Sequence, residues 1–254
     1  MTTPDKQQRI QESRYRFPYH YIPSCDDGNF VHAKVLRWGF EYLAYIRFVI
    51  ERIQTLSFDS LLDVGCGDGR LLWEVRQRFP DKDLVGIDVS EQAIRFARAM
   101  SPNVEYVCGD VSDPAVLAKE FDVITLIEVL EHIPPDRIQP FISGLHKRLE
   151  ANGVLVATVP SKNVKVTRKH YQHFDRESLA ETLKPHLAVS HCYFINRISR
   201  RTRWMKRLLA NRWFILNHRG LLNRLYRSYE KHLLPAEEHN AKRICVICRK
   251  SGTA

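Results

Sequence analysis

The sequence predicts an α/β fold, with a mostly parallel sheet of seven strands, helices on both faces of that sheet and a helical insertion between the last two strands. From about Ser57 onward, short apolar runs alternate with amphipathic stretches, which is the pattern of strands and helices around a parallel sheet. The chain has 254 residues, 44% of them hydrophobic, which is enough for the core of one such domain with an added element. The long segment 196–240 separates the last two apolar runs and therefore predicts the insertion.

Strands and helices are expected to alternate along the core. The strands are expected at 61–64, 84–88, 104–107, 121–127 and 153–158, and the helices at 71–79, 91–100 and 138–149. Apolar runs at 187–195 and 242–249 supply the sixth and seventh strands, and an amphipathic helix from about Ala33 to Thr55 precedes the first. These elements divide the chain into an N-terminal element (1–56), a core (57–195), the basic helical insertion (196–240) and the last strand with its tail (241–254).

The cysteines and the polar N-terminus favour a cytoplasmic location. Of six cysteines, only Cys245 and Cys248 have C-x-x-C spacing, and they lie in a run that predicts a strand, where residues i and i+3 point to opposite faces. We therefore expect buried, reduced thiols rather than a zinc half-site or a redox pair. The first residues lack the apolar run of a signal peptide, and no stretch approaches the roughly 18 apolar residues of a membrane-spanning helix.

A glycine-rich turn is the strongest functional signal in the sequence. Gly65, Gly67 and Gly69 follow the first strand of the core and directly precede a helix. Glycines remove side chains from such a turn, so that a ligand can approach the backbone and the helix N-terminus. Residue 70 is Arg, where the wider G-x-G-x-x-G spacing of a nicotinamide site would place its third glycine.

Acidic residues follow the next two strands. Asp88 ends the second strand about 20 residues beyond the turn, where a carboxylate can accept hydrogen bonds from both ribose hydroxyls of an adenosine. Gly109 and Asp110 end the third strand. Because the carboxyl ends of parallel strands meet at one edge of a sheet, these residues are expected to converge with the glycine turn on one ligand site.

In these motifs the chain resembles class I S-adenosylmethionine-dependent methyltransferases, whose cofactor loop reads D-x-G-x-G-x-G, as Asp63 to Gly69 do here. The resemblance covers about residues 57–195 and is closest to the group that includes the ubiquinone-biosynthesis O-methyltransferases. It implies a Rossmann-like fold, S-adenosyl-L-methionine as cofactor, and a cofactor site formed by Asp63, Gly65, Cys66, Gly67, Asp88, Val89, Gly109, Asp110, Val111, Ile127 and Glu128. In the same group a Glu-x-x-Glu-His motif follows the fourth strand, as 128–132 do here, and a Val-Pro-Ser segment and a His-x-x-His-Phe segment come later, here at 159–161 and 170–174.

The resemblance further implies O-methylation of a small-molecule, sugar or lipid-linked acceptor. A hydroxyl nucleophile needs a base, and histidine has a suitable pKa. We expect His132 to be that base, with Glu128, His170 and His173 bordering the reaction; the alternatives are that His132 orders its loop and that His173 is structural. Aromatic and histidine side chains of the N-terminal element are expected to cap the acceptor pocket or to pack across the fold: Tyr15, Phe17, Tyr19, His20 and Tyr21.

The net charge of +10 comes from one segment, because residues 197–232 hold eleven Lys and Arg and a single acid, Glu230. A helix through this block would place Met205, Leu209, Trp213 and Leu216 on one face. Arginine beside tryptophan on an amphipathic helix suits an anionic membrane surface or a lipid-linked acceptor, and hence peripheral association with the inner membrane face. A lid with a solvated basic face and, less favoured, a nucleic-acid site are the alternatives.

Two further functions compete with this interpretation. Glu128, Glu131 and His132, with His170 or His173, lie where metal-dependent RNA 3′-terminal 2′-O-methyltransferases hold a metal, although the same motif is widespread among metal-free relatives, so no metal is predicted here. A degenerate methyltransferase fold can also act as a non-catalytic cofactor-binding subunit. Degeneration usually removes the glycines or the ribose-binding acid, and all of these are present.

Overall fold

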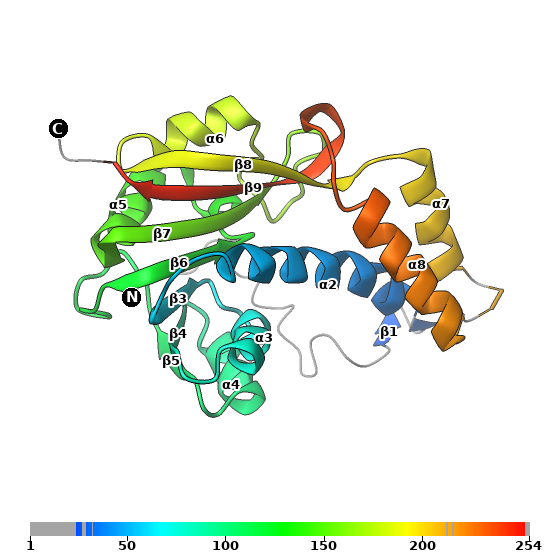
Figure 1. Ribbon diagram of the computed structural model, residues 1–254, viewed down its shortest axis with the longest axis horizontal. Helices are drawn as coiled ribbons and strands as arrows, with labels where there is room; N and C mark the ends of the chain where they lie inside the picture. Colours follow the sequence, from blue (N-terminus) through cyan, green and yellow to red (C-terminus); the bar gives the residue numbers. More distant parts are fainter. Residues whose placement is uncertain (1–23, 27–28, 32, 212, 215, 252–254) are drawn as a thin grey trace.

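A seven-stranded sheet forms the centre of the protein, in the order β5-β4-β3-β6-β7-β9-β8 (Figure 1). The structure is a computed structural model and describes residues 24–26, 29–31, 33–211, 213–214 and 216–251. The strands of the sheet are β3 (Ser60–Val64), β4 (Asp83–Asp88), β5 (Glu105–Cys108), β6 (Phe121–Ile127), β7 (Leu149–Pro160), β8 (Leu187–Arg197) and β9 (Ala241–Lys250). Pairings from β5 to β7 are parallel, and β9 runs antiparallel to both neighbours. The predicted mostly parallel sheet is confirmed.

Helices cover both faces of this sheet. The main helices are α2 (Ala33–Ile53), α3 (Arg70–Arg78), α4 (Glu91–Met100), α5 (Ile138–Arg148), α6 (Arg176–Leu183), α7 (Arg200–Leu209) and α8 (Arg219–His232). Short 3-10 turns are η1 (Leu130–His132), η2 (Pro135–Arg137) and η3 (Glu238–Asn240). Buried side chains of α2, α3 and α4 share one hydrophobic core with one sheet face, and those of α5 and α6 share a second core with the other. The fold is therefore the predicted three-layer α/β arrangement.

The alternation of side chains along the strands sorts them between the two cores. Leu61 belongs to the core under α2, and its neighbour Leu62 belongs to the core under α5. The same rule separates Cys245 from Cys248, which are buried free thiols in opposite cores. This confirms the expectation that the C-x-x-C pair does not converge.

The order of the strands places the site. The strand order reverses between β3 and β6. From β3 the chain adds strands toward β5 at one edge of the sheet, and from β6 it adds strands toward the other edge. In open α/β sheets, ligands bind outside the carboxyl ends of the strands at such a switch point. The glycine turn after β3 and the Glu-x-x-Glu-His motif after β6 both lie there.

The N-terminal region holds one element that the sequence did not predict. Strands β1 (Ser24–Asp26) and β2 (Asn29–Val31) form a two-stranded antiparallel sheet before α2. The predicted amphipathic helix is confirmed as α2. The predicted cap residues Tyr15, Phe17, Tyr19, His20 and Tyr21 lie outside the described residues.

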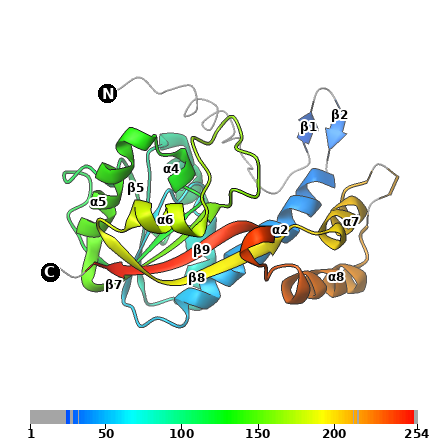
Figure 2. The same ribbon diagram turned by 90° about the horizontal axis from the view of Figure 1, so that it is seen from above.

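The segment between β8 and β9 holds α7 and α8, which lie beyond the sheet at one end of the molecule (Figures 1 and 2). Met205 and Leu209 of α7 and Tyr229 of α8 are buried in the core that contains α2. The expectation that Trp213 and Leu216 continue the apolar face of one long helix is wrong, because α7 ends at Leu209 and Trp213 is 78% exposed. Among the described residues, no helix is long and apolar enough to cross a membrane.

Candidate active site

The glycine turn after β3 has a backbone that other residues rarely adopt. Gly65, Gly67 and Gly69 have φ angles of 71°, 55° and 78°, all in the left-handed region. A Cβ atom on Gly65 would lie 2.4 Å from Val129 Cγ2, so the loop after β6 packs directly against the turn. The glycines thus allow the turn and bring the two loops into contact.

Asp88 is held at the end of β4 by two backbone hydrogen bonds. Its Oδ2 accepts from the N–H of Gly67 at 3.0 Å, and its Oδ1 accepts from the N–H of Ser90 at 2.9 Å. One carboxylate oxygen is therefore tied to the glycine turn and the other to the N-cap residue of α4. This fixes the carboxylate beside the turn, in the position from which an acid can bind the ribose of an adenosine.

Asp63 is buried, with its side chain turned into the sheet rather than toward solvent. Its Oδ1 accepts a hydrogen bond of 2.7 Å from Thr125 Oγ1 on β6. Burial raises the pKa of Asp63 to about 7, and the charge of Asp88 adds to the rise while the Thr125 hydrogen bond opposes it. Burial thus favours the protonated form of this carboxyl group.

The remaining predicted cofactor residues lie at or just after the carboxyl ends of β3, β4, β5 and β6. Asp110 is exposed after β5 and accepts hydrogen bonds from the backbone and hydroxyl of Ser112 at 2.9 and 2.7 Å. Val89 is 63% exposed, whereas Val111 is buried beside Asp110. Four more lie in the same edge of the fold: Cys66 in the glycine turn, Gly109 after β5, and Ile127 and Glu128 at the end of β6. The predicted residues therefore gather where the strands end.

Glu128 has an unusual backbone and two fixed side-chain contacts. Its φ of 58° is in the left-handed region, which is uncommon for a residue other than glycine and often marks a functional loop. Its Oε1 accepts from Thr158 Oγ1 at 3.1 Å, and its Oε2 accepts from Arg243 Nε at 2.9 Å. The side chain is thus held by β7 and β9 rather than pointing into open solvent.

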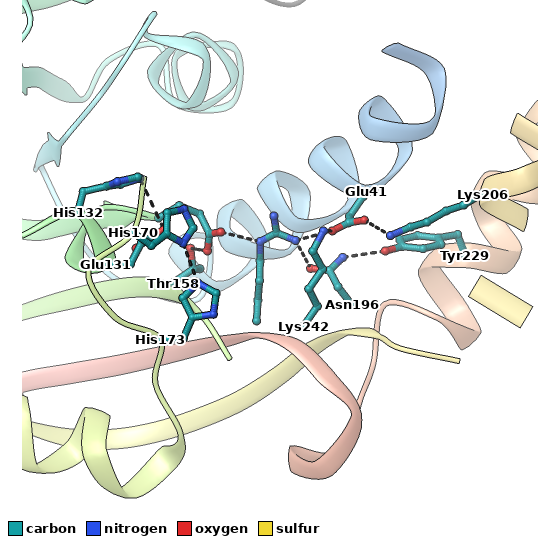
Figure 3. A network of polar contacts seen from close by, with 12 residues as sticks. Glu41, Glu131, His132, Thr158, His170, His173, Asn196, Lys206, Tyr229 and Lys242 are labelled. Atoms are coloured by element: carbon teal, nitrogen blue, oxygen red, sulfur yellow. Dashed lines mark hydrogen bonds and ion pairs between the residues drawn. The ribbon is translucent and has the colours of Figure 1, made fainter. Parts of the chain in front are cut away.

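Three histidines lie close together in the loops that follow β6 and β7 (Figure 3). His132 lies in η1, and its Nδ1 is 2.8 Å from the carbonyl oxygen of Lys169; because a carbonyl only accepts, this nitrogen carries the proton. His173 Nδ1 likewise donates to the carbonyl of Val164 at 2.7 Å, and so its Nε2 accepts from His170 Nδ1, also at 2.7 Å. In the neutral state the proton-accepting nitrogen is therefore Nε2 in both His132 and His170.

Glu131 is buried between these histidines, with 1% of its surface exposed. Burial raises its pKa well above the ordinary range, and the charge of Glu128 adds to the rise. Its Oε1 lies 3.9 Å from His132 Nε2, and its Oε2 has no hydrogen-bond partner among the described residues. Side-chain nitrogen and oxygen atoms of Glu131, His132 and His170 all lie within 4.8 Å of one another. A proton or a metal ion bound by this cluster would give the buried Glu131 Oε2 an interaction partner.

A buried ion network, which sequence reasoning missed, connects this site to the insertion (Figure 3). Arg243 on β9 donates from Nε to Glu128 and from Nη1 to Glu41 Oε1 at 2.7 Å, and its guanidinium lies over the ring of Tyr45 at 4.5 Å. Glu41 on α2 also pairs with Lys242 and, at 2.5 Å, with Lys206 on α7.

The network keeps its charges despite burial. Burial alone would raise the pKa of Glu41, but the charges of Arg243, Lys242 and Lys206 hold it well below its ordinary range. Burial and the charge of Arg243 lower the pKa of Lys242 to about 8, against the opposing effect of Glu41. Two sequence signals could have indicated buried charges here, although not which residues pair: an acid on the apolar face of α2 and an arginine directly before the apolar run 244–248.

Comparisons with known proteins agree with this geometry. A family model described as a methyltransferase domain matches residues 61–153. The ubiquinone biosynthesis O-methyltransferase of Coxiella burnetii is 33% identical over 120 residues, covering 46% of this chain and 50% of the relative. The mitochondrial ubiquinone biosynthesis O-methyltransferase of Schizosaccharomyces pombe is 30% identical over 129 residues, covering 48% and 45%. The chain thus spans about half the length of the curated relatives it matches.

A solved structure extends the likeness of fold over more of the chain. The N-methyltransferase NodS of Bradyrhizobium japonicum, crystallised with S-adenosyl-L-homocysteine, superposes with a TM-score of 0.58 at 15% identity, covering 84% of this chain and 88% of that one. At this identity the match concerns the fold alone. The strand order, the glycine turn joined to Asp88 and the family match over 61–153 lead to one conclusion. The chain has the fold of class I S-adenosylmethionine-dependent methyltransferases, with the match to a methyltransferase domain at residues 61–153.

Proposed function

We propose that this protein transfers a methyl group from S-adenosyl-L-methionine to a hydroxyl oxygen of a small-molecule, sugar or lipid-linked acceptor. The proposal rests on the contact between the loop of Glu128, Val129 and His132 and the glycine turn at Gly65. His132, the base that we propose, follows Val129 by three residues in the same loop. The two ubiquinone biosynthesis O-methyltransferases, similar over half their length, support an oxygen acceptor.

The side chains divide the work of the reaction. The cofactor, when bound, supplies an electrophilic methyl group on a sulfonium ion. Asp88 and the glycine turn hold its adenosine, as their position predicts. The Lys169 carbonyl keeps the proton of His132 on Nδ1, so Nε2 takes the proton from the attacking hydroxyl. His173 orients His170 through the 2.7 Å hydrogen bond between them, and His170 thereby borders the acceptor.

The test is methyl transfer from labelled cofactor, followed by identification of the methylated atom. We expect the label on oxygen, and His132→Gln should lower kcat/KM by about 100-fold or more, because general-base catalysis contributes roughly 10²–10⁴. Cofactor affinity, measured by calorimetry, should change little in this variant. Label found only on nitrogen or carbon would refute the proposal, and so would full activity of His132→Gln.

The cluster of Glu131, His132 and His170 favours a second candidate, a metal-dependent 2′-O-methyltransferase acting on RNA 3′ ends. Its two imidazoles and one carboxylate form a donor set that suits a transition ion better than magnesium. Glu131 Oε2, which has no hydrogen-bond partner among the described residues, is available as a ligand atom. Such an ion would be held by these three residues and would polarise the attacking hydroxyl.

Chelation separates the two candidates. If methyl transfer survives extensive treatment with a chelator, and RNA ending in a free 2′-hydroxyl is not methylated, the first candidate stands. Loss of activity that is restored by one added metal would favour the second, and Glu131→Gln should then weaken binding of that metal when it is titrated by calorimetry. The calorimetric readout does not require an active enzyme.

A further inference from the structure

We propose that the outer surface of α7 and α8 binds an anionic lipid bilayer. Exposed cations cover this surface: Arg200, Arg201, Arg203 and Arg207 on α7, and Arg219, Arg224, Arg227 and Lys231 on α8. None of them has an acidic partner in a salt bridge among the described residues. The acid of the segment, Glu230, pairs with Arg47 on α2 at 3.1 Å. The insertion therefore presents positive charge that no acid in the described part of the chain pairs with.

Large apolar side chains stand among these cations. Trp204 is 62% exposed on α7, and Trp213 and Phe214, in the connection between the two helices, are 78% and 53% exposed. Exposed aromatic rings beside arginines suit the interface of a membrane, where an amphipathic ring lies at the level of the headgroups. A lid that only faced water would gain nothing from exposing them.

The geometry of α7 separates the surface that packs from the surface that is left exposed. Thr202, Met205 and Leu209 are buried against the fold. On the opposite face, Arg200, Arg203, Trp204 and Arg207 follow the i, i+3, i+4, i+7 spacing of one helix face. Met205 and Leu209, the part of the predicted apolar stripe that lies in α7, are thus used in the core. The membrane contact that we propose uses the arginine face, with Trp204 at its centre.

The position of the insertion supports a planar, charged partner. Figures 1 and 2 show α7 and α8 together at one end of the molecule, beyond the edge of the sheet. A flat anionic bilayer can meet several cations and aromatic rings of a projecting helix pair at once. A binding site for a small anion would instead need buried polar groups around a pocket. This inference does not rest on the proposed methyl transfer.

The experiment is co-sedimentation of the full chain with vesicles of phosphatidylcholine containing phosphatidylglycerol, beside vesicles of phosphatidylcholine alone. We expect binding to the anionic vesicles only. Replacing Arg200, Arg203 and Arg207 by Gln should weaken it about 100-fold, because each basic residue near an anionic surface contributes roughly fivefold in affinity. The matched control replaces Arg137, Arg176 and Arg249, exposed elsewhere on the protein, and should bind like the original chain.

Tryptophan fluorescence adds a readout that charge alone does not move. With anionic vesicles the emission should shift to shorter wavelength, and the shift should be lost when Trp204 and Trp213 are replaced by Phe. The proposal is overturned if the chain ignores anionic vesicles, or if both triple variants bind equally well. It is also overturned if a single-stranded RNA, measured by fluorescence anisotropy, needs the same arginines while the vesicles are not bound. Circular dichroism of each variant confirms that it is folded.

Discussion

Neutralising Glu41 is the sharpest test of the ion network. Glu41→Gln keeps the size of the side chain and removes the carboxylate that Arg243, Lys242 and Lys206 share. Arg243 is then left buried with one carboxylate partner, Glu128, in place of two. We expect the variant to be folded but clearly less stable, because a buried charge that loses its partner keeps its desolvation cost.

The size of the loss follows from the burial of each pair. Removing one partner from a buried ion pair costs about 3–5 kcal/mol, and the Arg243–Glu41 pair is 11% and 7% exposed. Glu128 still compensates Arg243, which places the loss near the lower end. Lys206 and Lys242 are 29% and 33% exposed, so solvent screening limits each to about 1 kcal/mol or less. Together these give about 3–5 kcal/mol, or a fall in Tm of roughly 6–20 °C.

Urea unfolding followed by circular dichroism measures this loss directly. The control is Glu51→Gln, a carboxylate on the same helix that is 56% exposed and lies 4.0 Å from Arg52, and it should change stability by about 0.5 kcal/mol or less. If Glu41→Gln proves as stable as Glu51→Gln, the buried network does not stabilise the fold and the reasoning is refuted.

Three further variants test the cofactor site. Gly65→Ala places a non-glycine residue at a φ of 71°, with its Cβ 2.4 Å from Val129. We expect the free energy of unfolding in urea to fall by at least about 1 kcal/mol. Adding Val129→Ala should restore part of this loss, and no restoration would contradict the contact. Asp88→Asn should weaken S-adenosyl-L-methionine binding in calorimetry by about tenfold or more, because hydrogen bonds to a charged acceptor contribute about 1.5–3 kcal/mol; unchanged affinity would place the ribose elsewhere. Asp63 binds a proton more tightly in the folded state, because its pKa rises from 3.8 to about 7. Ionising Asp63 therefore lowers the stability of the folded protein by nothing below pH 4 and by progressively more up to pH 7, at most roughly 4 kcal/mol. The stability of Asp63→Asn relative to the original chain should therefore rise between pH 4 and pH 7, and a constant difference across that range would refute the raised pKa.

Local patterns explain why much of the fold could be predicted from the sequence. The glycine turn, the acid that ends β4 and the apolar strands are each set by neighbours along the chain or by strand periodicity. The resemblance to class I methyltransferases then assigned Gly65, Asp88 and Asp110 to one cofactor site. The carboxyl ends of β3, β4 and β5 bring these residues to one edge, as the sequence predicted.

The parts that could not be predicted depend on contacts between distant residues. Arg243 is 202 residues from Glu41 and 115 residues from Glu128, and no local pattern shows that the three side chains meet. The end of α7 was missed for a related reason. Apolar residues continue at helical spacing to Trp213 and Leu216, but α7 ends at Leu209. Trp213 is exposed, and Leu216 packs partly against the core from outside the helix.

The ion network physically connects the insertion to the candidate active site. Lys206 ties α7 to Glu41, Glu41 is joined through Arg243 to Glu128, and the loop of Glu128 packs on the glycine turn. A bilayer bound to the outer face of α7 would therefore contact a helix that the ion network connects to the loop of Glu128. For a lipid-linked acceptor, this arrangement would place the membrane and the proposed methyl-transfer site at the two ends of one continuous chain of contacts.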